Sequence, residues 1–222
     1  MDAQNIPLWG RADLRDFATP QDGSGKTFDF ALSFALPMGP GIMAGIQKGP
    51  NREYAHEYAR VNQRINDLSA GLAKAIRDKG LKALALPASK RTDKVNIRGD
   101  FPQKTAATQA GLGWIGKNCQ LITRSFGPWV RLGCVFTDLD LRPCGPARQK
   151  SLCGRCRRCI DACPARALKG NPWYPGRPRN EILDVRACDQ WKKTHYFQYH
   201  KGHNCGICSA VCPHGLKGNK KA

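Results

Sequence analysis

The 222-residue chain lacks a long apolar segment and is poor in acidic side chains. Its longest mostly apolar stretch is Phe28–Met38, which Asp29, Ser33 and Pro37 interrupt. That stretch falls far short of the ~20 apolar residues that a membrane-spanning helix needs. The first residues also show no basic segment followed by an apolar one, so a secretory signal is not expected. These absences predict a cytoplasmic protein without a membrane partner.

The scarcity of acidic residues makes the chain strongly basic. Asp and Glu number 17 against 36 Lys and Arg, which gives a formal net charge of +19. Residues 142–222 hold 17 basic and 4 acidic residues, whereas residues 1–141 hold 19 and 13. A basic excess of this kind fits two partners, tRNA phosphates or an acidic electron donor such as ferredoxin or flavodoxin. The charge alone leaves both open.

Cysteine is the residue present in unusual number. The chain has 11 cysteines, and eight of them lie between residues 153 and 212. In a reducing cytosol, clustered cysteines indicate metal binding more often than disulfides. The cysteines and the charge step coincide, and residues 141–151 contain prolines and a glycine. We therefore predict two domains, residues 1–141 and residues 142–222.

The first domain is predicted to alternate strands and helices. The apolar run 28–36 favours a buried strand, and a Gly/Pro-rich loop follows over 37–50. Residues 51–79 show an apolar stripe with steps of three and four, which is typical of an amphipathic helix. A second strand is predicted over 81–87. Strand, helix and strand together form a βαβ unit, for which parallel strands are expected.

The remainder of this domain is predicted to hold a short helix and two more strands. The helix covers 103–110, and the strands cover 119–123 and 129–137. The turn at 125–128, which contains Gly and Pro, favours a hairpin between these strands. The predicted fold is α+β, with an N-terminal α/β sandwich around a mixed sheet, followed by a ferredoxin-like double-cluster domain.

Two cysteine runs carry the clearest chemistry. The first is the bacterial ferredoxin run, Cys153-x2-Cys156-x2-Cys159-x3-Cys163-Pro164. In such runs three thiolates ligate one iron–sulfur cluster and the fourth ligates the other. The second run is Cys205-x2-Cys208-x3-Cys212-Pro213. It is one cysteine short of a full copy, because Gly202 stands at the remaining position.

The missing ligand has an upstream candidate in Cys188. Crosswise ligation then gives two complete sets, with none of the eight clustered cysteines left over. One set is Cys153, Cys156, Cys159 and Cys212, and the other is Cys163, Cys188, Cys205 and Cys208. The alternative is a pair of all-cysteine zinc sites. Zinc ligands usually come as two CxxC pairs, so the observed spacing favours two [4Fe–4S] clusters.

A glycine-punctuated segment, AGLGWIGKN, covers residues 110–118. Its glycines at 111, 113 and 116 allow a backbone to approach a flat or phosphorylated ligand closely, and Trp114 offers a surface for a macrocycle. The alternative is that these glycines serve only as turns between elements.

The motifs, taken in order, resemble those of the epoxyqueuosine reductase family. They are KTAATQAGLGWIGKN, RLGCVFTDLDL, CGRCRRCIDACPARAL, LDVRACDQW and CGICSAVCP, and they run from Lys104 to Pro213. The resemblance implies a cobalamin in the α/β domain beside two [4Fe–4S] clusters. It also implies the reduction of an epoxide on a modified tRNA nucleoside to an alkene. The residues expected to bind the cobalamin are Gly111, Gly113, Trp114, Gly116 and Lys117.

The chain departs from the family at two places. The family has a catalytic Asp in a DSAP-like stretch before the GLGW segment, where this chain reads VNIRGDFPQKTA. Asp100 is the nearby carboxyl and is predicted as the proton donor, with Asp93 as an alternative. The chain also stops ten residues after Cys212, so we expect a short relative that lacks the family's C-terminal helical region. Two further functions stay open: an electron carrier without a substrate, and a corrinoid-dependent reductase of a small molecule, as in reductive dehalogenation.

Overall fold

The computed structural model describes residues 5–141, 143, 146–147 and 150–218. It confirms the predicted α+β class. The described residues form two compact units, and each unit draws on three segments of the chain. The first unit combines Met1–Leu36, Val61–Leu112 and Arg131–Arg148, and the second combines Pro37–Arg60, Gly113–Val130 and Gln149–Ala222. A domain boundary between residues 141 and 142 stays a prediction, and Cys144 in that stretch lies outside the described residues.

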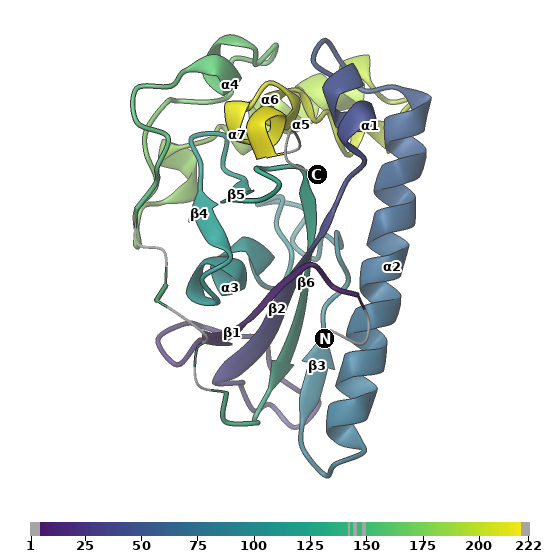
Figure 1. The fold of residues 1–222 in the computed structure, drawn as a ribbon, viewed down its shortest axis with the longest axis vertical. Helices are drawn as coiled ribbons and strands as arrows, with labels where there is room; N and C mark the ends of the chain where they lie inside the picture. The colour runs from purple at the N-terminus through teal and green to yellow at the C-terminus, as the bar shows by residue number, and fades with distance from the viewer. Residues whose placement is uncertain (1–4, 142, 144–145, 148–149, 219–222) are drawn as a thin grey trace. The chain divides into compact units, whose positions relative to one another are not determined.

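The elements follow one another in mixed order (Figure 1). The strands are β1 Leu8–Asp13, β2 Phe30–Pro37, β3 Ala83–Ala85, β4 Gly113–Ile115, β5 Leu121–Thr123 and β6 Val130–Thr137. The α-helices are α1 Pro40–Gly45, α2 Arg52–Arg77, α3 Gln103–Gln109, α4 Arg158–Asp161, α5 Val185–His195, α6 Ile207–Ala210 and α7 Pro213–Gly218. Two short 3-10 helices are η2 Arg179–Glu181 and η3 His200–Gly202.

The first unit is built on a four-stranded sheet with the order β1-β2-β6-β3. β1 pairs antiparallel with β2, and β3 pairs antiparallel with β6. The two strands of the predicted βαβ unit, β2 and β3, therefore share a sheet, but β6 lies between them. No strand is predicted at β1, because small residues occupy its buried positions. A Cβ at Gly10 would lie 2.5 Å from the Ala110 carbonyl oxygen, so this position excludes an apolar side chain.

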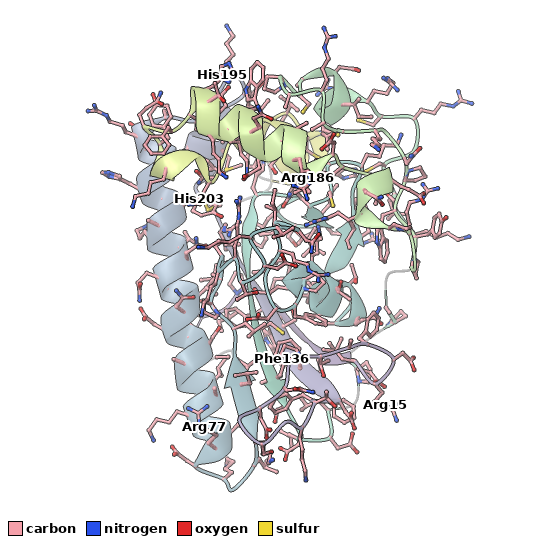
Figure 2. All side chains as sticks on the ribbon, turned by 180° about the vertical axis from the view of Figure 1, so that it is seen from behind. Arg15, Arg77, Phe136, Arg186, His195 and His203 are labelled. Carbon is pink, nitrogen blue, oxygen red and sulfur yellow. The ribbon has the colours of Figure 1, made fainter. Side chains whose placement is uncertain are left out.

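The core of this unit joins α2 to the sheet, and Figure 1 shows α2 running beside β3. Ala73 and Ile76 of α2 pack against Val135 of β6. Phe136, labelled in Figure 2, is fully buried, with its ring centroid 5.1 Å from that of Phe101. The apolar stripe predicted on the long helix therefore faces the sheet, as its spacing indicates.

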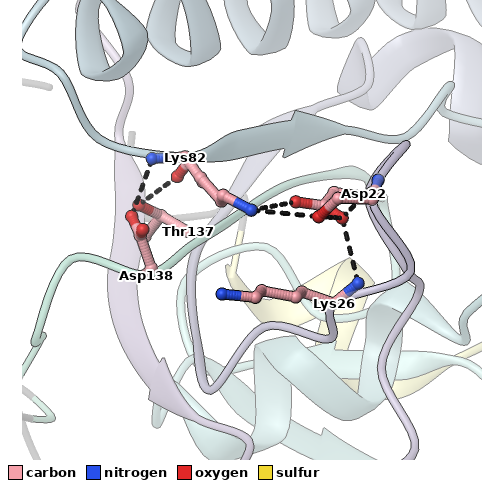
Figure 3. Close-up of polar contacts among 6 residues, drawn as sticks. Asp22, Lys26, Lys82, Thr137 and Asp138 are labelled. Carbon is pink, nitrogen blue, oxygen red and sulfur yellow. Dashed lines mark hydrogen bonds and ion pairs between the residues drawn. The ribbon is translucent and has the colours of Figure 1, made fainter.

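Lys82, just before β3, ties two loops to the sheet (Figure 3). Its ammonium lies 2.7 Å from Asp22 Oδ2, and its backbone N–H donates to Asp138 Oδ1 at 2.8 Å. The Thr137 hydroxyl donates to the Lys82 carbonyl at 2.9 Å. Several hydrogen bonds hold the pKa of the Asp22 carboxyl well below its usual range, and the one from Lys82 contributes most.

Two predicted features of the connecting segments are wrong. β5 and β6 do not form a hairpin: β5 pairs with β4 in a separate two-stranded sheet of the second unit. Thr123 and Gly127 bridge each other and close a tight loop, which ends β5 before it could pair with β6. The predicted loop 37–50 also contains α1, whose first turn starts with proline.

No helix in the part of the chain that the structure describes combines the length and the apolar character needed to cross a bilayer.

Cys134 on β6 is expected to resist alkylation in the native state. Its side chain is fully buried, and burial raises the pKa of its thiol far above the usual value, so almost no reactive thiolate forms. Anaerobic treatment with iodoacetamide followed by peptide mass spectrometry checks this. The same treatment in denaturant is the control and should modify Cys134 fully. Rapid modification of Cys134 in the folded protein would contradict the burial.

Candidate metal centres

Four cysteines from the two runs line one pocket in the second unit. The complete lining is Lys117, Asn118, Ile122, Cys153, Cys156, Cys159, Cys212, Pro213 and His214. Cys212 comes from the second run, more than 50 positions after the other three cysteines. The structure thus brings together the first crossed set, and Cys163 is absent from this lining.

The thiols of this pocket influence one another. Burial is the main cause that raises the pKa of Cys159 to about 12, and the thiols of Cys153, Cys212 and Cys156 add to the rise. Burial likewise raises the pKa of Cys212 to about 11. Neighbouring thiolates repel, so this group ionises fully only when a cation or a cationic cluster compensates the charge.

The second crossed set also gathers in this unit. Burial raises the pKa of Cys205 to about 11, and the thiols of Cys188 and Cys163 add to that rise. Burial raises the pKa of Cys208 even more strongly, with contributions from Cys205, Cys188, Cys159 and Cys163 in that order. The four members therefore lie within electrostatic range of one another.

Helix α5 positions Cys188. Its N-cap residue Asp184 accepts hydrogen bonds from the backbone N–H groups of Arg186 and Ala187, at 3.1 and 3.0 Å. The Cys188 N–H then donates to the Asp184 carbonyl at 3.1 Å. Figure 2 shows α5 with Arg186 and His195 labelled near its two ends. The cap fixes the first turn of the helix and, with it, the place of Cys188.

Gly202 explains why the second run is one cysteine short. Its φ of +68° lies in the left-handed region, which side-chain-bearing residues rarely adopt. A Cβ there would also lie 2.8 Å from the Lys192 carbonyl oxygen and from the Lys193 Cα. Any cysteine at 202 would therefore collide with α5, the helix that carries the substitute cysteine.

The donor sets fit multi-iron clusters better than single ions. Within residues 5–141, 143, 146–147 and 150–218, no three His, Cys, Asp or Glu side chains lie close enough to hold one metal ion. A four-iron cluster holds its four thiolates farther apart than a single tetrahedral ion does. Buried polar groups beside both sets also lack partners in this part of the chain: Trp114 Nε1 in the first case and the side-chain amide of Asn204, next to Cys205, in the second. Such groups cost free energy unless something accepts or donates to them.

Residues 113–118 of the glycine-punctuated segment belong to the same unit as the cysteines, whereas residues 110–112 belong to the first unit. Trp114 packs against Ile122, Cys153 and Cys212, and its ring lies edge-on to His214 with centroids 5.0 Å apart. Gly113 and Gly116 allow β4 to approach β5, because added Cβ atoms would lie 2.2 Å from the Ile122 carbonyl oxygen and 2.4 Å from its Cδ1. Gly111 turns the chain with φ of +73°. A cobalamin-binding role for these residues stays a prediction.

Two side chains of this segment and that of Trp129, just before β6, hold the cysteine loops. Sequence reasoning missed two of the three. Lys117 donates to the carbonyls of Gly154 and Cys156, at 2.7 and 3.2 Å. Asn118 Nδ2 donates to the Cys208 carbonyl at 3.2 Å, and Trp129 Nε1 donates to the Ser209 carbonyl at 2.8 Å. Asn118 and Trp129 carry no sequence signal for this role, because their partners lie 80 to 90 positions away.

The predicted proton donors lie in the first unit. Asp100 is exposed and sits in a bend shortly before α3. Asp93 accepts hydrogen bonds from the backbone N–H and side-chain amide of Asn96, both at 2.8 Å, and from Arg98. The Asn96 donors lower the pKa of Asp93 to about 2, with a smaller contribution from Arg98. Because its pKa lies below that of an ordinary carboxyl, Asp93 is protonated less readily and is poorly suited to donate a proton.

The Asp93 carboxyl is expected to titrate near pH 2 in the folded chain, below its ordinary pKa of 3.8. Because the folded-state pKa is lowered, the loop stabilisation that it provides is complete above pH 3.8 and is lost as pH falls through about 2. Carbon-detected NMR of the side-chain carboxyl measures the midpoint. Asn96→Ala removes one donor and should raise the midpoint toward 3.8. A parent midpoint already at 3.8 would show that these contacts are not formed in solution.

Comparison with known proteins relates the cysteine-containing part of the chain to iron–sulfur proteins. A family model for the 4Fe-4S double cluster binding domain matches residues 152–215. An epoxyqueuosine reductase of Synechocystis sp. is 34% identical over 152 residues, which cover 61% of this chain and 48% of the relative. For two other epoxyqueuosine reductases the share of the relative is 40% and 38%. The chain thus spans about half or less of the length of these curated relatives.

Solved structures share the fold over nearly the whole chain. A reductive dehalogenase structure that suggests a mechanism for B12-dependent dehalogenation aligns with a TM-score of 0.72 and 19% identity, covering 97% of this chain and 31% of that chain. An epoxyqueuosine reductase with an epoxyqueuosine-modified tRNA stem loop aligns with a TM-score of 0.63 and 16% identity, covering 97% and 63%. The chain therefore shares its fold with these structures, and it is similar in sequence to the curated epoxyqueuosine reductases over half or less of their length.

Proposed function

We propose that the chain is an oxidoreductase that holds two [4Fe–4S] clusters through the two crossed sets of thiolates. The observation that carries this proposal is the single pocket lined by Cys153, Cys156, Cys159 and the distant Cys212. Clusters of this type supply single-electron transfer when bound. The match of residues 152–215 to a double cluster binding domain supports the same assignment.

Backbone groups near the cysteines favour ligation by their thiols. The backbone N–H groups of His214 and Gly215 donate to Cys212 and oppose the rise in pKa that burial causes. These donors favour the thiolate, which is the ligating form. Tight turns after Cys153 and Cys205 use Gly154 and Gly206, both with positive φ, to place the next cysteine of each run.

As substrate we propose an epoxide on a modified tRNA nucleoside, reduced to an alkene. The similarity to epoxyqueuosine reductases supports this choice, and the basic excess of residues 142–222 suits a phosphate-rich partner. A cobalamin, when bound, supplies a low-valent cobalt centre that accumulates electrons. We assign it to Gly111, Gly113, Trp114, Gly116 and Lys117. Asp100, which is exposed, is the proposed proton donor when the epoxide oxygen leaves.

One observation favours a second candidate function. The fold aligns with a reductive dehalogenase at a TM-score of 0.72, above the 0.63 of the tRNA-bound epoxyqueuosine reductase. A corrinoid-dependent reductase of a small molecule is therefore the alternative. For either reaction we propose a cytoplasmic location and an acidic ferredoxin or flavodoxin as the electron donor, because the cysteine-containing part is strongly basic.

Complementation separates these functions. The full chain is expressed in a bacterial strain that accumulates epoxyqueuosine, and the tRNA nucleosides are analysed by mass spectrometry. We expect queuosine to appear, and we expect Cys153→Ala/Cys212→Ala to abolish it. Asp100→Asn should reduce it strongly, whereas Asp16→Asn, at another exposed position, should not.

Metal analysis of the anaerobically purified protein decides the cofactors. About eight irons and one cobalt per chain support the enzyme. Iron without cobalt and without queuosine supports an electron carrier, and iron with cobalt but without queuosine supports the small-molecule reductase. Zinc without iron would overturn the cluster assignment itself.

A further inference from the structure

Lys117 makes contacts that its predicted role does not explain. It follows β4, and only 8% of its surface is exposed. Its ammonium donates to the carbonyl oxygens of Gly154 and Cys156, at 2.7 and 3.2 Å. Both acceptors lie in the loop from Cys153 to Cys159, which carries three cysteines of the first set. Lys117, which lines the pocket, therefore binds the backbone that positions the thiols of that pocket.

The charge of Lys117 lacks a counter-ion in the described part of the chain. No ion pair joins its ammonium to a carboxylate of those residues, and its hydrogen bonds go to the two neutral carbonyls. Lysine is rarely buried without a paired charge, because removing an ammonium from water is energetically unfavourable. The side chain instead lines the pocket that contains the four thiols. Four thiolates around an iron–sulfur core carry a net negative charge, which is the partner that this ammonium lacks.

We propose that Lys117 is a positioning residue for the first cluster: it anchors the loop from Cys153 to Cys159, and its charge raises the reduction potential of the cluster held there. This inference rests on the proposed [4Fe–4S] clusters. Reduction adds one negative charge to the cluster. A fixed positive charge nearby, in a partly desolvated pocket, stabilises the reduced form more than the oxidised form.

Near the second set, the described residues show a lysine whose charge is paired. Lys192 lies near Cys205, where it lowers the thiol pKa, but it is 3.5 Å from the buried carboxylate of Asp189. Lys193 is 2.8 Å from the same carboxylate. The positive charge near the second set is therefore largely compensated, so the effect of Lys117 should be confined to one of the two clusters.

Potentiometric titration of the full chain, reconstituted anaerobically and followed by electron paramagnetic resonance, tests this. Lys117→Gln keeps a hydrogen-bond donor but removes the charge, and Lys117→Arg keeps both. Lys169→Gln removes the same charge from an exposed position. We expect Lys117→Gln to make reduction of one cluster about tenfold less favourable, which is a fall of about 59 mV for a one-electron couple. The other cluster should be unchanged, as should both clusters in Lys117→Arg and Lys169→Gln.

The outcomes separate this inference from the proposed function. If no variant and not even the parent takes up iron, the proposed function fails. If Lys117→Gln carries the full iron content with both potentials unchanged, only the role of Lys117 fails. Loss of about half the iron in Lys117→Gln but not in Lys117→Arg supports the role, because the charge then holds the loop. Equal shifts or equal losses in the two Lys117 variants overturn it, since the charge is retained in one of them.

Discussion

The double variant Cys163→Ala/Cys205→Ala is expected to keep about half of the parent's iron. In the crossed arrangement both substitutions fall in the second set, so the first cluster keeps its four thiolates. If each run instead served its own cluster, the two substitutions would remove one ligand from each cluster. The structure favours the crossed arrangement, because Cys212 lines the pocket of Cys153, Cys156 and Cys159, and Cys163 does not.

The matched control is Cys153→Ala/Cys205→Ala, which removes one ligand from each cluster in either arrangement and should lose nearly all iron. Cys134→Ala serves as the control for thiol loss outside both sets. Iron analysis and electron paramagnetic resonance after anaerobic reconstitution give the answer. If Cys163→Ala/Cys205→Ala loses as much iron as the control, the thiolates are not shared across the runs.

The second large effect is expected at Gly127, in the turn after β5. Its φ is +56°, and an added Cβ would lie 2.2 Å from the Gly215 nitrogen and 2.5 Å from the His214 carbonyl carbon. Both are backbone atoms of α7, which begins directly after Cys212, so neither can rotate away as a side chain would. We expect Gly127→Ala to lower the free energy of unfolding by about 3 kcal/mol or more. It should also weaken iron loading at the first set.

Gly176→Ala is the matched control for this prediction. Gly176 also has a positive φ, +86°, but a Cβ there meets no atom within 4 Å. Only the backbone penalty then applies, about 1 kcal/mol. Denaturant unfolding of both cluster-loaded variants, followed by circular dichroism, provides the comparison. Equal midpoints in the two variants would show that the approach of Gly127 to Gly215 is not as close as described.

The local parts of this molecule could be predicted from the sequence, whereas the pairing of the strands could not. The apolar stripe of α2 and the strands β2 and β6 follow from patterns within one segment. The cysteine spacing is also local, and it was sufficient to propose both crossed sets. The partner of β5 depends instead on how two segments meet in space. The apolar pattern of residues 119–123 fits pairing with β4 as well as with β6, so the predicted hairpin was wrong.

The candidate site shows the same division. Cys188 could be proposed from the sequence because Gly202 stands where a full second run would have a cysteine. The fourth ligand therefore had to come from elsewhere in the chain. The carbonyl acceptors of Lys117, Asn118 and Trp129 leave no trace in the sequence, since any residue has a carbonyl. A lysine after a glycine-rich turn is typical of ligand binding in general. The structure is needed to show that Lys117 binds the loop that carries the cysteines.

Residues 113–130 contact both cysteine runs and precede them in the chain. During translation these residues therefore leave the ribosome before any of the eight clustered cysteines. A fragment that starts at residue 149 would therefore expose the backbone oxygens of Gly154, Cys208 and Ser209 without their donors. The double-cluster part of this protein therefore depends on residues 113–130. Transfer of this part into another protein must include those residues.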